Sequence, residues 1–280
     1  MDKLTTLGNP ATRRVAGVLI GAALLISGCA TPPENDPAAM ETYRQANDQA
    51  EPFNRTVFDV NMGLDKAVLK PISYVYKETV PLEGRQAVTS FLDNLRTPVI
   101  FANDLMQGEA RRAWTTLVRF VANSTFGIGG LIDVAADMGY AKHDEDFGQT
   151  LAVWGVGDGS YLMLPLFGPS NPRDAIGRVV DIILDPMTWF APNYLQYARF
   201  GTEAVDSRTA HYNEIEDLEK NSLDFYAAVR SLYRQKRTDE IRNGVPTATP
   251  FGPSPTGAGA PMELPDQKAS DEAQPGAAAK

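Results

Sequence analysis

The sequence predicts a mainly α-helical protein with one folded domain, and three observations support this class. Apolar residues recur at steps of three and four along most of residues 50–243, as on one face of a helix, whereas strand-like alternation is scarce. Proline and glycine occur where helices would begin and end. Residues 126–168 are instead rich in glycine, which favours turns, so we expect a helical domain with an irregular central segment.

The helices can be placed from their apolar faces and their end signals. The first apolar face is formed by Phe53, Val57, Val60, Leu64 and Ala67. Proline suits a first turn, so helices are expected to begin near Pro71, Pro81, Pro98 and Pro172. Thr97 would cap the helix that Pro98 begins, and Gly108 would end it. Residues 194–242 predict a long charged helical region, broken near Asn221.

The first 28 residues have the organisation of a secretory signal peptide. Three basic residues flank the start of an uncharged apolar run over 15–26, which is shorter than the roughly 20 residues that a membrane-spanning helix needs. The run ends in Ile-Ser-Gly before Cys29, which resembles the bacterial lipobox. We therefore predict cleavage before Cys29 and lipidation of that cysteine by acyl chains such as palmitate.

Several features constrain the chain after the cleavage site. Cys29 is the only cysteine, so its lipidation leaves no disulfide within the mature chain. Ala30 lies next to it, where an aspartate would resemble an inner-membrane retention signal, which points to the outer membrane. Residues 29–49 are polar and predict a flexible tether. Residues 244–280 are rich in proline, glycine and alanine and predict a disordered tail.

Charge excludes two classes of partner. The formal net charge is −9, and removal of residues 1–28, which carry a net +2, lowers it to −11. This acidity argues against nucleic-acid binding and against electrostatic adhesion to anionic lipid. The mature chain has no apolar run long enough to span a bilayer.

Motifs that carry catalysis in other proteins lack their context here, so we predict no enzyme, no metal and no cofactor. A nucleotide-binding loop follows a strand and, in one class, ends in Gly-Lys-Ser/Thr, whereas the run Gly127-Ile128-Gly129-Gly130 has no clear strand before it and no such sequence after it. Asp146-Phe147-Gly148 lacks the other parts of a kinase. Four adjacent polar residues at 143–146 favour a solvated turn or a polar rim over a zinc site. The chain has no Gly-x-Ser-x-Gly elbow for a hydrolase.

The aromatic residues of 187–200 allow two interpretations. Trp189, Phe190 and Tyr194 are suited either to core packing or to a membrane interface, where one part of the ring is wet and the other apolar.

The order of motifs along residues 50–235 resembles the MlaA (VacJ) family of outer-membrane lipoproteins. The residues that carry this resemblance are Glu51-Pro52-Phe53-Asn54-Arg55, Leu69-Lys70-Pro71, Asn94-Leu95, Pro98, Asn103-Asp104-Leu105-Met106-Gln107-Gly108, the stretch from Arg119 to Asp133, the stretch from His143 to Leu151, Trp154-Gly155-Val156-Gly157, the stretch from Tyr161 to Ser170, and Arg173-Asp174. Several collinear motifs make this resemblance more specific than any one glycine cluster.

The resemblance implies a ring-like helical domain in the inner leaflet of the outer membrane, with an amphipathic channel for glycerophospholipids. It also implies two partners, a trimeric outer-membrane porin and a soluble periplasmic lipid carrier. Such a protein would remove mislocalised phospholipid from the outer leaflet and maintain lipid asymmetry. A structural lipoprotein that only docks on an outer-membrane protein is the alternative.

The glycine-rich segment is where we expect the lipid path. A charged head group needs polar groups and water to pass hydrocarbon, and irregular backbone at membrane depth is tolerated where it lines a cavity. We predict that the path is formed by Asn123, Ser124, Phe126, Gly127, Gly129, Gly130, Leu131, Asp133 and Gln149.

Overall fold

The protein is described from a computed structural model, which covers residues 40, 43 and 46–243. The predicted signal peptide, the lipidation site Cys29, most of the tether and the predicted tail lie outside these residues. The folded elements, in chain order, are α3 (Glu51–Leu64), the π-helical turn η2 (Asp65–Leu69), α4 (Lys70–Thr79), α5 (Leu82–Gln107), α6 (Ala110–Thr125), α7 (Val134–Asp137), α8 (Phe147–Val153), β1 (Leu162–Leu164), β2 (Gly168–Ser170), α9 (Pro172–Leu184), α10 (Pro186–Phe190), α11 (Asn193–Ala210), α12 (Tyr212–Asn221) and α13 (Phe225–Ile241). The mainly helical class is confirmed.

Most of the predicted helix ends are confirmed. Pro81 caps α5 and Pro172 begins α9. Pro71 lies in the first turn of α4, where the helical backbone continues from η2. Gly108 ends α5 in the left-handed conformation, with φ of 79°. The charged C-terminal region is broken after Asn221, as expected, and also at His211, where α11 gives way to α12.

The predicted helix start at Pro98 is wrong, because α5 runs through it without a break. The Thr97 hydroxyl does not cap a helix but donates to the Asp93 carbonyl one turn earlier, at 3.1 Å. A proline inside a helix removes one backbone hydrogen bond. The packing of α5 against α6, α8 and α9, which buries Val99 and Ile100 on the same turns, outweighs that loss.

The glycine-rich segment contains more regular structure than the sequence indicates. It includes the short helices α7 and α8 and the antiparallel hairpin of β1 and β2, in which Leu162 pairs with Ser170 and Leu164 with Gly168. Two side chains fix the hairpin to α3. Asn54 accepts from the Met163 amide at 2.9 Å, and Asn61 donates to the Leu164 carbonyl at 3.0 Å.

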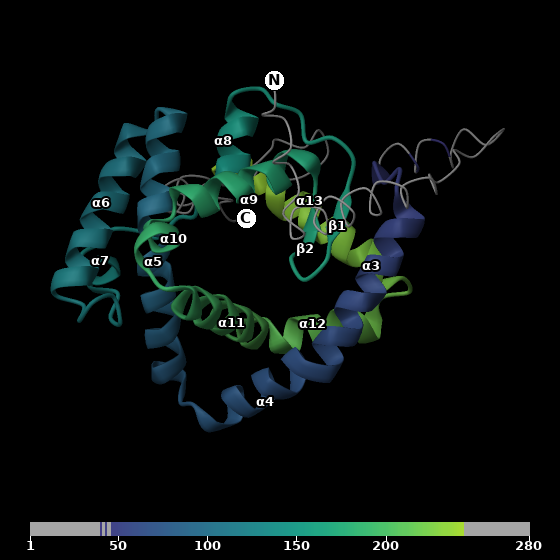
Figure 1. The fold of residues 1–280 in the computed structure, drawn as a ribbon, viewed down its shortest axis with the longest axis horizontal. Helices are drawn as coiled ribbons and strands as arrows, with labels where there is room; N and C mark the ends of the chain where they lie inside the picture. The colour runs from purple at the N-terminus through teal and green to yellow at the C-terminus, as the bar shows by residue number, and fades with distance from the viewer. Residues whose placement is uncertain (1–39, 41–42, 44–45, 244–280) are drawn as a thin grey trace, which may run out of the picture. The chain divides into compact units, whose positions relative to one another are not determined.

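The helices of residues 46–243 are arranged around a central opening (Figure 1). Helix α9, α13 and the hairpin lie on one side of it, and α11 and α12 lie on the other. Helix α5 passes along a third side, with α6 and α7 outside it, and α3 continues through η2 into α4 along the remaining edge. This ring-like arrangement agrees with the expected architecture.

Polar and apolar side chains are distributed in the opposite way from a water-soluble globule. Among the described residues, more polar and charged side chains than apolar ones are buried, and the one apolar core cluster is small: Val57, Phe58, Tyr161, Met163 and Tyr226. Large apolar side chains are instead exposed on most helices. Exposed apolar surface of this extent indicates contact with a membrane or a partner, because a soluble monomer rarely tolerates it.

The exposed apolar residues follow the outer helices. On α9 and α10 they include Ile176, Val179, Ile183, Trp189 and Phe190, and Phe190 is 88% exposed. On α3, η2 and α4 they include Val60, Val68, Ile72 and Val75. In the part of the chain described, no helix combines the length and the apolar character that crossing a bilayer requires. Trp189 and Phe190 are 68% and 88% exposed, so they are not core residues. Their place at a membrane interface stays a prediction.

Candidate functional site

A cavity of about 730 Å³ lies between α5, α9, α10, α11, α13 and the tip of the hairpin. These elements are among those that surround the opening in Figure 1. Its walls combine ionised side chains with aromatic ones. The aromatic part includes Phe167 from the hairpin and Phe200 from α11, whose ring centroids are 5.6 Å apart. The cavity is therefore amphipathic, with room for a polar group and for apolar chains.

Arg237 of α13 holds three elements of the cavity wall together. Its guanidinium donates to both carboxylate oxygens of Asp146, each at 2.6 Å, and to Asp174 at 3.0 Å. Asp146 caps α8 and Asp174 lies in the first turn of α9. Burial by itself would raise the pKa of both carboxyls, but hydrogen bonds and charge from Arg237 outweigh it, so the pKa of each lies below its ordinary value.

Glycine makes this junction possible. A Cβ atom on Gly177 of α9 would lie 2.3 Å from the backbone nitrogen of Gly148 in α8, so the two helices approach at backbone contact. A Cβ atom on Gly148 would lie 2.5 Å from the Arg237 guanidinium. Larger residues at these two positions would separate the carboxylates from the arginine.

The opposite wall has a second arginine cluster. Arg199 of α11 contacts Asp185 at 2.5 Å and Glu203 at 2.7 Å. Asp185 precedes α10 and caps it, accepting from the Met187 amide at 2.9 Å. Arg199 therefore connects α11 to the short α9–α10 corner.

Asp181 is a carboxyl of the cavity wall without an arginine or lysine within 4.0 Å among the described residues. It accepts from the Asn103 amide at 3.0 Å and from the Phe147 backbone at 3.1 Å. Burial raises the pKa of Asp181 to about 6, although these hydrogen bonds oppose the rise. Its charge consequently changes in mildly acidic solution.

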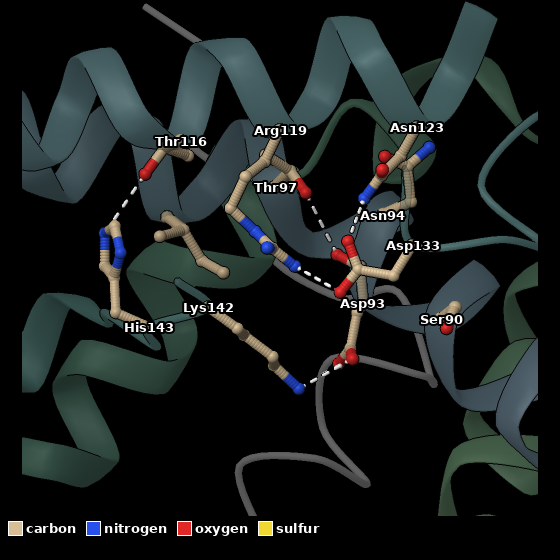
Figure 2. A pocket seen from close by; sticks show the side chains of 11 residues that line it. Ser90, Asp93, Asn94, Thr97, Thr116, Arg119, Asn123, Asp133, Lys142 and His143 are labelled. Atoms are coloured by element: carbon tan, nitrogen blue, oxygen red, sulfur yellow. Dashed lines mark hydrogen bonds and ion pairs between the residues drawn. The ribbon is translucent and has the colours of Figure 1, made fainter. Parts of the chain in front are cut away.

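None of the nine residues predicted for the lipid path lines this cavity. Asn123 and Asp133 lie instead at a much smaller pocket of about 30 Å³ between α5 and α6, which has room for about one water molecule (Figure 2). Arg119 and Asn123 both donate to Asp133, at 2.8 and 2.9 Å, and Asp133 caps α7. In Figure 2 these three side chains point toward one another, as members of a structural network do.

The neighbouring predicted residues are also placed by local structure. Ser124 accepts from the Asn94 amide at 3.0 Å. A Cβ atom on Gly127 would lie 2.2 Å from the Ile132 carbonyl oxygen. Gly130 has φ of +100°, and a Cβ atom on it would lie 2.6 Å from the Asn94 side chain. Both positions therefore require glycine. Gly129 has open space around it.

The remaining three predicted residues are spread over different environments. Phe126 is 76% exposed and Leu131 is 41% exposed, and both belong to the apolar outer surface beside α6. Gln149 is buried in α8, where its backbone amide donates to Asp146 at 2.9 Å. The assignment of these nine residues to a lipid path stays a prediction.

The polar run at 143–146 is not a solvated turn, because Glu145 is 1% exposed. Glu145 forms an ion pair with Arg112 and accepts from Gln107 at 2.8 Å, and His143 contacts Asp104 at 3.1 Å. Burial raises the pKa of Glu145. No group of three or more potential metal ligands is formed within the described residues.

Sequence reasoning missed the residues that form the cavity wall. Arg237 contacts Asp146 across 91 positions, and Arg199 contacts Asp185 from a different helix. No local motif signals such pairs. Tyr197 and Phe200 belong to the aromatic residues of 187–200, and Asp146, Phe167 and Asp174 lie in motifs that carry the family resemblance. These are the sequence signals that point to the cavity.

The fold and the cavity define a class: a ring-like helical protein with an apolar exterior and a charged, partly aromatic interior. The model of the family described as "MlaA lipoprotein" matches residues 46–240. The chain is 32% identical over 237 residues to a Haemophilus influenzae protein named "Intermembrane phospholipid transport system lipoprotein MlaA", covering 83% of this chain and 92% of that protein. An Escherichia coli K12 protein of the same name is 31% identical over 237 residues, covering 82% and 89%.

A solved structure reported under "Structural basis for maintenance of bacterial outer membrane lipid asymmetry" is also similar. It has a TM-score of 0.63 and 32% sequence identity, and the match covers 69% of this chain and 98% of that one. The chain belongs to the MlaA lipoprotein family.

Proposed function

We propose that this protein is an outer-membrane lipoprotein that moves glycerophospholipid between membranes through its central cavity. It would take mislocalised phospholipid from the outer leaflet and pass it to a soluble periplasmic carrier, beside a trimeric porin. The family and the names of the relatives above support the transport of phospholipid. The observation that carries the proposal is an amphipathic cavity enclosed by helices whose outer surfaces are apolar.

The physical reason is the cost of moving a phosphate through hydrocarbon. An ionised group at membrane depth is expensive unless polar partners and water accompany it. The cavity contains arginines, carboxyls and open volume, and its apolar side includes Phe167, Phe200 and Ile182. Head group and acyl chains would therefore each meet a compatible wall.

The outer surface supports a position in the membrane leaflet. Helices with one strongly apolar face lie in the interface without spanning it. Tyr194, which is 69% exposed, is suited to the interface itself, where the ring is buried and its hydroxyl meets water. Trp189 presents its exposed ring there, while its indole nitrogen donates to the Ile183 carbonyl at 2.8 Å. Lipidation of Cys29 would hold the chain at the inner leaflet of the outer membrane. The transfer breaks no bond, so we propose no enzymatic activity.

The proposal is tested by measuring surface phospholipid in cells that lack the protein. A phospholipase added to intact cells reports the phospholipid exposed in the outer leaflet. We expect more product after deletion and the original level after complementation with the wild-type chain. Unchanged surface phospholipid in an intact envelope would refute transport and favour a scaffolding lipoprotein that docks on another outer-membrane protein.

A pair of variants at one position tests the cavity itself. Ile182→Glu adds a negative charge to the wall, which would repel a phosphate, whereas Ile182→Gln adds polarity and similar bulk without charge. We expect the glutamate variant to complement the deletion poorly and the glutamine variant to complement it largely. Equal complementation by both would place the lipid path outside this cavity.

A further inference from the structure

Within the described part of the chain, ion pairing in the cavity leaves two cations without a carboxylate partner. Arg237 and Arg199 are paired as described above. Among the described residues, no carboxylate oxygen lies within 4.0 Å of the guanidinium of Arg178 on α9 or of Arg96 on α5. Arg96 is exposed, so water can solvate its charge, but Arg178 is half-buried.

Arg178 is held in place by an aromatic ring and little else. Its guanidinium carbon lies 5.1 Å from the centroid of the Phe167 ring, and its Nη1 atom donates to the Phe167 carbonyl at 3.5 Å, a long contact. Stacking against a ring fixes the plane of the guanidinium but does not use its in-plane donors. Those donors remain available to a ligand in the cavity.

The surroundings of Arg178 are unfavourable for an isolated charge. Burial lowers the pKa of Arg178, because removal of water disfavours the charged form. An anion would restore the lost stabilisation. A guanidinium binds the two oxygens of a phosphate or carboxylate side by side, and the adjacent Phe167 and Phe200 rings would contact apolar chains. An anion attached to hydrocarbon fits both features.

We propose that Arg178, stacked on Phe167, binds the phosphate of a glycerophospholipid inside the cavity. This inference rests on the proposed function and names the group that recognises the substrate. One guanidinium matches the single negative charge of a phosphodiester. The recognised chemistry, a phosphate ester, also occurs in soluble phosphates, and the experiment separates the two sources.

The test uses the full-length lipidated protein in a detergent without phosphate. Native mass spectrometry measures binding of dioctanoyl phosphatidylglycerol and of dioctanoylglycerol, which has the same chains and no phosphate. The variant is Arg178→Gln, and the matched control is Arg111→Gln, at an exposed position of α6 outside the cavity lining. We expect Arg178→Gln to weaken phosphatidylglycerol binding about tenfold or more, since charge-assisted hydrogen bonds are lost.

Binding of dioctanoylglycerol should be unchanged in Arg178→Gln, and both lipids should bind Arg111→Gln as they bind the wild type. The ratio of the two affinities does not depend on the folded fraction, so a variant that folds poorly still gives a valid result. Arg178→Lys, which keeps the charge without the planar fork, should recover part of the preference for phosphate.

Each other outcome overturns a defined part of the proposal. Equal phosphatidylglycerol binding by wild type and Arg178→Gln would refute the role of Arg178 and leave the proposed function standing. Equal weakening of both lipids would show a structural role. If glycerol 3-phosphate competes at the concentration at which phosphatidylglycerol binds, the site is for a soluble phosphate. If the wild type binds neither lipid, the proposed function itself fails.

Discussion

The junction of α8, α9 and α13 allows a sharp prediction about stability. Arg237→Met replaces a guanidinium that is 8% exposed with an apolar side chain of similar length, and leaves behind the buried carboxylate of Asp174 and the half-buried carboxylate of Asp146. Asp174 keeps other donors, because Asn171 donates to it at 2.7 Å and Tyr233 at 2.5 Å. Asp146 keeps the Gln149 backbone amide, at 2.9 Å. Asp146 is therefore the group that the substitution affects most.

The expected cost is about 3 kcal/mol, at the lower end of the range of about 3–5 kcal/mol for removing one partner of a buried ion pair. The lower end applies because Asp174 remains hydrogen-bonded. A second substitution, Asp146→Asn, should restore part of the loss in the double variant, since asparagine still caps α8 and carries no charge. Lys236→Met is the matched control. That lysine is 77% exposed and adjacent in sequence, so we expect a change below about 0.5 kcal/mol.

The measurement is guanidinium-induced unfolding of the detergent-solubilised protein at two pH values. In the wild type the pKa of Asp146 and of Asp174 is lowered, so their contribution is present above the ordinary value of 3.8 and is lost as the pH falls through the lower folded value. Without Arg237 the pKa of Asp146 should rise above 3.8, and protonation should relieve the cost of the buried charge in mild acid. The difference between wild type and variant should therefore shrink from about pH 7.5 to about pH 4.5. An equal difference at both pH values, or a change no larger than that of Lys236→Met, would refute this reasoning.

Three further predictions concern stability. Gly177→Ala should cost about 1–3 kcal/mol, because its Cβ would meet the backbone of Gly148, whereas Gly63→Ala, in open helical surroundings, should stabilise by about 0.5–1 kcal/mol; urea midpoints compare the two. Asp181 has a pKa of about 6 in the folded state against an ordinary 3.8, so the free energy of unfolding of the wild type should fall by about 1–3 kcal/mol as the pH rises from about 4 to about 6.5. In Asp181→Asn the free energy of unfolding should depend less on pH over this range. The same pH dependence in both proteins would contradict the raised pKa of Asp181. Asn54→Ala removes a fully buried amide that donates to the Tyr161 carbonyl and accepts from the Met163 amide, so it should lower the free energy of unfolding by more than about 1 kcal/mol. A smaller loss, measured by calorimetry, would contradict the role of Asn54 in fixing the hairpin.

The ion pairs of the cavity wall explain why substitutions of its arginines should act on function as well as on stability. Arg237 and Arg199 connect different helices across the wall, so the same ion pairs that stabilise the ring also define its interior. Arg178 is different, because no carboxylate oxygen among the described residues lies within 4.0 Å of its guanidinium, and its donors are available to a ligand. Pairing therefore separates structural cations from a binding cation.

Local sequence determined the helices and many of their ends. The positions of Pro71, Pro81, Gly108 and Pro172 follow from backbone chemistry that acts within a few residues, and the structure agrees at each. Pro98 is the exception. There the same local rule predicts a helix start, but the energy of packing α5 against its neighbours is a tertiary term that the local pattern does not contain.

The sequence alone also determined the family resemblance and the glycine-rich segment, but tertiary structure decided what that segment does. Gly127 and Gly130 allow close backbone contacts, and Asn123 and Asp133 join α6 to α7. Only Asp146 and Phe167 of this segment line the cavity. The rest of the wall depends on side chains that are far apart in the chain and meet only when α9, α11 and α13 surround a common space. Periodicity reports which face of a helix is apolar, but whether that face meets a core or the outside depends on which helices pack together.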